Sequence, residues 1–158
     1  MGSYADDALF MSRNNIEYVE LISDDGKSKV MVIPAWQGRV MTTSAAGDEG
    51  DSYGWINYSF IKKRQIDLQF NPVGGEERFW LGPEGGVFSL YFRQGEKQIY
   101  KNWKVPPVLD IEAFKIQSQS KNCICLTKEG CLTNACGTTF YLNIKRTISL
   151  LDINEFAA

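Results

Sequence analysis

Histidine is absent from this chain of 158 residues. The absence excludes histidine as a general acid or base, as a metal ligand and as the partner of a nucleophilic serine or cysteine. A basic surplus is also lacking, because 17 Lys and Arg residues stand against 19 Asp and Glu residues, for a net charge of -2. Binding to a phosphate backbone needs a basic face, so we expect no nucleic-acid partner.

Long apolar runs are missing as well. No stretch approaches the roughly 18 apolar residues that a transmembrane helix requires, and no basic segment followed by an apolar one marks a secretory signal. We therefore expect no transmembrane segment and a soluble chain, with the compartment open between periplasm and cytoplasm. An apolar content of 44% is enough for one core, which favours a single domain over residues 1–158.

Cysteine is confined to one region, with the spacing C-x-C-x5-C-x4-C starting at Cys123. This spacing lacks the C-x2-C pairs of common zinc sites. Cys123 and Cys125 are two residues apart in a strand-like run, so they share one face and cannot easily bond to each other. We expect buried or half-buried free thiols, no metal and no cofactor. A disulfide from this pair to Cys131 or Cys136 and a metal site remain as alternatives.

Short β-type segments separated by turns make up most of the chain. Residues 3–13 carry the only clear helix pattern, with Ser3 as the cap and apolar residues at helical spacing. Asp25-Gly26 indicates a tight hairpin turn, because such turns need positive φ. The expected strands are residues 16–22, 28–33, 36–43, 87–92, 109–117, 122–127, 130–133 and 139–151. This pattern predicts an all-β fold, an antiparallel β-sandwich or barrel with a short N-terminal helix.

Residues 74–86 combine glycines and a proline with aromatic and charged residues. Glycine lets the backbone approach a ligand or another segment closely. The ring of Trp80 suits stacking on the apolar face of a sugar, while Arg78 and Glu84 suit hydrogen bonds to its hydroxyls. The alternative is an Arg–Glu pair that braces a tight loop, and both roles are compatible.

Further residues are candidates for the same site. Arg39 follows Gly38 in a strand and is either a residue of this site or a surface residue. Trp55 and Asn57 share one face of an expected strand, where an aromatic residue lines a cleft or belongs to the core. Glu76 supplies a further carboxylate, as glycosidase chemistry would need. The candidate ligand-binding residues are Arg78, Trp80, Glu84, Glu76, Arg39, Trp55 and Asn57; no catalytic residue is assigned.

Two segments carry a resemblance to known proteins. VMVIPAWQGRVM, residues 30–41, resembles the opening of the galactose-mutarotase-like β-supersandwich. GGEERFWLGPEGG, residues 74–86, is similar to a GG-x-x-R-x-W-x-x-P-E signature in uncharacterised bacterial families of that superfamily. SYGWINY (52–58), NACGTTF (134–140) and KRTI (145–148) also resemble one such family of unknown function, found in gut Bacteroidetes.

The resemblance implies a β-sandwich that is the N-terminal part of a longer supersandwich. It also implies that Arg39 is a polar group at the mouth of the sheet, as is common in mutarotase-like proteins. Mutarotases of this superfamily pair a His acid with a Glu base from the later part of the domain, and this chain offers neither. We therefore expect a carbohydrate-binding β-sandwich without independent catalysis. The alternatives are an incomplete aldose epimerase or other sugar-processing enzyme, and a structural or interaction module. Open sheet edges also predict a homo-oligomer.

Overall fold

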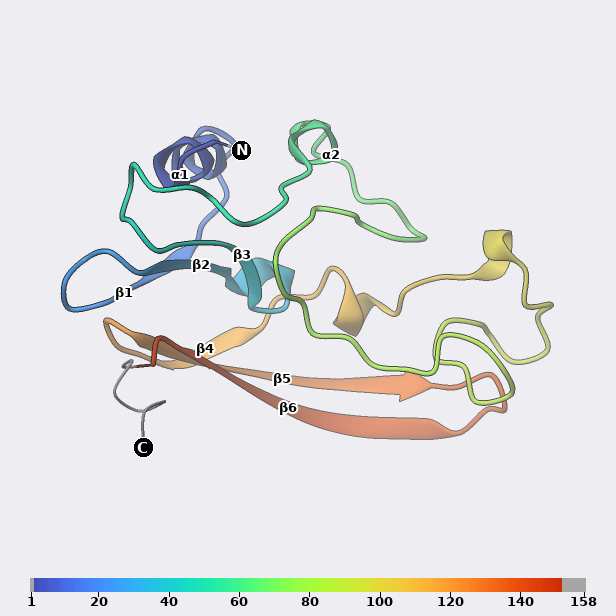
Figure 1. The fold of residues 1–158 in the computed structure, drawn as a ribbon. Coiled ribbons are helices and arrows are strands. Elements are labelled where there is room, and N and C mark those ends of the chain that lie inside the picture. The colour runs from blue at the N-terminus through green and yellow to red at the C-terminus, as the bar shows by residue number, and fades with distance from the viewer. Residues whose placement is uncertain (1, 152–158) are drawn as a thin grey trace.

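The computed structural model describes residues 2–151. It contains two antiparallel three-stranded sheets and a short N-terminal helix (Figure 1), which confirms the predicted all-β fold. The first sheet consists of β1 (Val19–Ile22), β2 (Lys29–Ile33) and β3 (Arg39–Ser44). The second consists of β4 (Lys115–Gln119), β5 (Cys123–Thr133) and β6 (Thr139–Ser149). The helical segments are α1 (Tyr4–Arg13), α2 (Tyr58–Lys62) and the 3-10 turns η1 (Pro34–Trp36), η2 (Tyr100–Asn102) and η3 (Pro107–Leu109).

The helix α1 begins at the predicted cap. The Ser3 hydroxyl accepts a hydrogen bond from Asp6 N at 3.2 Å, and the Asp6 carboxylate accepts one from Ser3 N at 3.0 Å. This reciprocal pair satisfies two backbone donors at the helix start. The buried side chains of Tyr4 and Met11 then attach α1 to the first sheet.

The hairpin between β1 and β2 also forms as predicted. Gly26 has φ +74°, and the Asp25 carboxylate accepts a hydrogen bond from Lys27 N at 3.0 Å. The backbone of Ser23 and Ser28 closes the turn with a hydrogen bond of 3.0 Å.

The first sheet is the middle layer of the fold, with α1 and α2 on one face and the second sheet on the other (Figure 1). Successive residues of β2 point to opposite faces. Val30 and Val32 belong to the core shared with the second sheet, whereas Met31 and Ile33 belong to the core under α1. Burial on both faces explains why β2 is apolar from Val30 to Ile33 instead of alternating.

The prediction of a strand at residues 87–92 is wrong. This segment forms turns and bends, because the Ser89 hydroxyl donates to Glu84 O at 2.7 Å and accepts from Tyr91 N at 3.1 Å. Its β-type composition reflects burial instead, since Tyr91 and Phe92 belong to the core between the sheets.

Other strand predictions need smaller corrections. Residues 122–127 and 130–133 form one strand, β5, because Gly130 continues the ladder where Val108 packs against the strand. The prediction of a strand containing Trp55 and Asn57 is also wrong. Asn57 instead caps α2 and accepts a hydrogen bond from Phe60 N at 3.2 Å. The strand expected at 109–117 starts only at Lys115, after η3.

All four cysteines are free thiols in the structure. Cys125 is buried and Cys123 half-buried, whereas Cys131 and Cys136 are exposed, so the expected burial is wrong for the latter two. Over residues 2–151, no group of three or more His, Cys, Asp or Glu side chains gathers at one place. None of the helices in this part of the chain is long and apolar enough to cross a membrane.

Candidate functional site

The glycine-rich segment is fixed in place by close backbone contacts. Gly75 N donates to Trp55 O at 2.8 Å, and Asn57 N donates to Val73 O at 3.0 Å. A Cβ atom on Gly74 would lie 2.2 Å from the Trp55 carbonyl oxygen, so only glycine fits here. Glu76 N donates to Val40 O at 2.9 Å, which holds the start of residues 74–86 along β3.

Arg78 points into the protein. Its guanidinium donates to Leu109 O at 2.6 Å and lies 3.4 Å from Asp110 Oδ1. The same group lies 4.1 Å from the ring centre of Trp80 and 5.3 Å from that of Phe70. Burial lowers the pKa of Arg78, and the Asp110 carboxylate opposes that change. Arg78 therefore braces residues 74–86 against η3.

Asp110 is the buried end of this brace, with 5% of its surface exposed. Its Oδ2 atom accepts hydrogen bonds from Asn71 N at 2.9 Å and Asn71 Nδ2 at 2.7 Å. Burial raises the pKa of Asp110, while the bonds from Asn71 and the charge of Arg78 oppose the rise. A buried carboxylate with an arginine and two amide donors is a well-satisfied structural group.

Trp80 connects the brace to the surface. Its indole Nε1 donates to Glu84 Oε1 at 2.8 Å. Its ring is half-buried, with the Arg78 guanidinium against its face, Tyr91 at 5.1 Å and Phe70 edge-on at 6.3 Å between ring centres. Glu84 itself is exposed. The structure thus brings Arg78, Trp80 and Glu84 into one chain of contacts, in which only Glu84 faces solvent freely.

Three further rings form a parallel arrangement beside Trp80. The rings of Tyr91 and Trp103 stack at 5.6 Å with an angle of 7°, and those of Tyr100 and Trp103 stack at 6.3 Å with an angle of 11°. We call these three residues the aromatic stack. Tyr91 is buried, Trp103 is half-buried and Tyr100 is 78% exposed, so the stack leads from the core to the surface.

A shallow pocket of about 340 Å³ adjoins the outer end of this stack. Its lining residues are Glu84, Phe92, Gln98, Ile99, Tyr100 and Trp103. The Gln98 amide is fixed because its Oε1 accepts a hydrogen bond from Gly86 N and its Nε2 donates one to Gly86 O, each at 2.7 Å. The pocket therefore has an aromatic wall, one exposed carboxylate and a rigid amide.

Sequence reasoning did not select Tyr100 and Trp103. Both lie in a polar segment without a motif, and η2 alone brings the two rings to the same side. The available signal was the spacing of two large aromatic residues three positions apart among polar ones, which indicates a shared face on a helical turn.

Arg39 lies elsewhere, and its interpretation as a surface residue is wrong. Only 1% of its surface is exposed, and it donates to Gly74 O at 2.8 Å and to Gln37 Oε1 at 3.2 Å. Burial is the main cause that lowers the pKa of Arg39 to about 10. Arg39 thus supports the backbone of the glycine-rich segment from beneath.

The remaining candidates do not join Trp80 and Glu84. Glu76 is exposed and accepts a hydrogen bond from Thr43 Oγ1 at 3.0 Å. Trp55 is 64% exposed, so its interpretation as a core residue is wrong. The Asn57 amide donates to Pro72 O at 2.9 Å and caps α2.

Comparison with known proteins gives a family but no activity. A family model described as "Family of unknown function (DUF6786)" matches residues 2–158. No curated protein and no solved structure matches the chain. The ligand class that the pocket can bind therefore has to be inferred from the residues that line it.

Proposed function

Because the chain belongs to this family of unknown function, we propose on the basis of its geometry that it binds carbohydrate and does not catalyse a reaction. The observation that carries the proposal is the exposed ring of Tyr100, stacked on Trp103 beside the carboxylate of Glu84. Aromatic rings stack on the apolar face of a sugar, and carboxylates accept hydrogen bonds from its hydroxyls.

The pocket residues are held ready for such a ligand. Trp80 holds Glu84 Oε1, while Glu84 Oε2 has no hydrogen-bond partner within residues 2–151 and is left to accept from a hydroxyl. Trp103 fixes the plane of the Tyr100 ring. A preformed arrangement reduces the entropy that binding costs, which supports recognition of sugar by this surface.

The positions of the carboxylates favour binding over hydrolysis. Glycosidases commonly need two carboxyl groups flanking the scissile bond, and Glu84 is the one carboxylate among the residues that line this pocket. Glu77 forms an ion pair with Arg146, with 2.5 Å between Oε2 and Nη2, and Glu76 accepts a hydrogen bond from Thr43 Oγ1. We propose in addition that the fold derives from the galactose-mutarotase-like superfamily. The chain lacks the His acid and the late Glu base with which mutarotases of that superfamily catalyse their reaction.

Substitution of Tyr100 tests the proposal. We expect Tyr100→Ala to weaken binding to soluble polysaccharides by about tenfold, because a stacked ring contributes about 1 kcal/mol or more beyond its buried area. Affinity electrophoresis against a panel of neutral polysaccharides measures the effect. Tyr53→Ala, which removes another exposed tyrosine, is the matched control and leaves the retardation unchanged. Absence of retardation by every polysaccharide would contradict the proposal.

We also propose that copies of the chain associate through β6. This strand of 11 residues pairs with β5 along one edge, and no strand covers its other edge within residues 2–151. It also exposes Phe140 and Tyr141, the latter by 88%. Long uncovered edges with apolar residues recruit further strands.

Sedimentation velocity over a series of protein concentrations tests this association. We expect the sedimentation coefficient to rise with concentration for the native chain and to fall towards the monomer value for Tyr141→Lys, because an added charge opposes edge pairing. Tyr53→Lys adds the same charge away from β6 and serves as the control. A native chain that stays monomeric at every concentration would exclude the association.

A further inference from the structure

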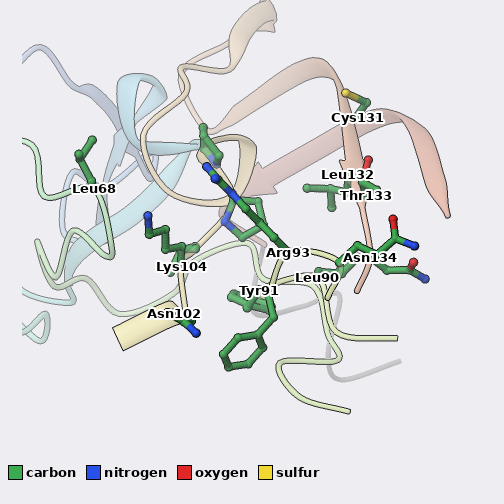
Figure 2. A pocket seen from close by; sticks show the side chains of 15 residues that line it. Leu68, Leu90, Tyr91, Arg93, Asn102, Lys104, Cys131, Leu132, Thr133 and Asn134 are labelled. Atoms are coloured by element: carbon green, nitrogen blue, oxygen red, sulfur yellow. The ribbon is translucent and has the colours of Figure 1, made fainter. Parts of the chain in front are cut away.

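A second pocket of about 580 Å³ shares Phe92 with the pocket beside Tyr100. Figure 2 shows the side chains around it. Its volume falls within the range of roughly 300–1,000 Å³ that is usual for small-molecule sites. The pocket lies between the irregular central segment and the end of β5, which contributes Cys131, Leu132 and Thr133.

The walls of this pocket are largely apolar and rigid. Phe92, Val105 and Leu132 line it, and all three belong to the buried core between the sheets. Leu90 packs against the same core. Lys104 N donates to Tyr91 O at 2.9 Å, which ties together the two chain segments that form much of the lining. The apolar part of the wall is therefore formed by side chains that the core holds in place.

Two cations line the same pocket, and no acidic residue does. Arg93 extends across the pocket in Figure 2, and its guanidinium ends on the side where the Lys104 ammonium lies. Within residues 2–151, neither side chain forms an ion pair or a hydrogen bond, whereas Arg78 and Arg146 are both paired with carboxylates. The positive charge at this pocket is thus uncompensated in a chain whose net charge is negative.

We propose that this pocket binds a small organic carboxylate: the apolar body of the ligand rests on Phe92 and Leu132, and its carboxylate lies between Arg93 and Lys104. Apolar walls favour burial of a hydrocarbon body, and two cations that line the same pocket favour a carboxylate through charge-assisted hydrogen bonds. This inference is independent of the proposed sugar site, because it uses neither Tyr100 nor Glu84.

Isothermal titration of the native chain with octanoate tests the inference, with octanol as the uncharged ligand of equal length. Octanoate should bind measurably, octanol about tenfold more weakly, and added salt should weaken the binding of octanoate alone. Arg93→Gln and Lys104→Met should each weaken octanoate binding by about tenfold. Lys101→Met removes a nearby exposed cation that does not line the pocket and leaves binding unchanged.

The outcomes distinguish a specific carboxylate site from non-specific binding of apolar ligands to the surface. Equal binding of octanoate and octanol, an equal loss in Lys101→Met, or no binding of octanoate would each overturn it. Circular dichroism of each variant shows whether the fold is retained. Both substituted side chains are exposed, so the variants are expected to fold.

Discussion

Replacing Gly74 by alanine is expected to lower the free energy of unfolding by about 4 kcal/mol. The new Cβ would lie 2.2 Å from the Trp55 carbonyl oxygen, a backbone atom that cannot rotate away. Relief requires the two segments to separate, which breaks the hydrogen bond from Gly75 N to Trp55 O and removes Gly74 O from Arg39. Gly74 also has φ +95°, where any Cβ adds strain.

Gly86→Ala is the matched control for this substitution. Gly86 also has a positive φ, +83°, but a Cβ there meets no atom within 4 Å. It should therefore show only the conformational cost, about 1 kcal/mol. Urea unfolding followed by tryptophan fluorescence measures both variants. Equal losses in the two would show that the close approach at Trp55 contributes nothing.

Arg78→Met is expected to lower the free energy of unfolding by about 3 kcal/mol at neutral pH. Methionine keeps an apolar contact with Trp80 and Phe70, so the loss comes mainly from two polar groups. Asp110 remains buried without its cation, and Leu109 O loses a donor. Removing one partner of a buried pair costs more than the pair itself contributes.

The effect of Arg78→Met should depend on pH. Burial raises the pKa of Asp110 and Arg78 opposes that rise, so the variant has a still higher folded-state pKa. The folded variant then keeps a proton that the unfolded chain has released, and its stability falls as the pH rises through that range. On acidification Asp110 becomes neutral, and the difference between native chain and variant should shrink.

Unfolding of both proteins at neutral and at acidic pH measures this narrowing. Lys121→Met, which breaks an exposed ion pair with Asp24, is the control and should change stability little at either pH. A difference between the native chain and Arg78→Met that is the same at both pH values would show that Asp110 is not the group responsible.

The sequence was sufficient to predict those elements of the fold that depend on contacts between residues close together in the chain. Ser3 and Asp6 form a capping box within one turn, and Asp25-Gly26 closes a hairpin whose strands adjoin it. Each structure depends on residues a few positions apart, so their identities decide the outcome. The long β6 was likewise predicted from its own composition, ending two residues earlier than expected, at Ser149.

The parts of the fold and of the candidate site that could not be predicted from the sequence depend on contacts between distant segments. Residues 87–92 have the composition of a strand, but Tyr91 and Phe92 are buried in the core between the sheets without the segment pairing with any strand. Arg39 was interpreted as either a polar group at the mouth of the sheet or a surface residue, but it is buried and donates to Gly74 O, 35 positions further along the chain. The contact of Arg78 with Asp110 spans 32 positions, and the aromatic stack depends on the packing of Trp103 against Tyr91 from another segment.

Both sheets are built from neighbours in the chain, in the orders β1-β2-β3 and β4-β5-β6. The core between them, however, takes Tyr91, Val105 and Phe114 from the long irregular segment that separates the two sheets in sequence. Pairing within each sheet closes only short loops, whereas docking of that segment needs both sheets in place. We therefore expect the two three-stranded meanders to form early in folding and the connecting segment to pack between them last.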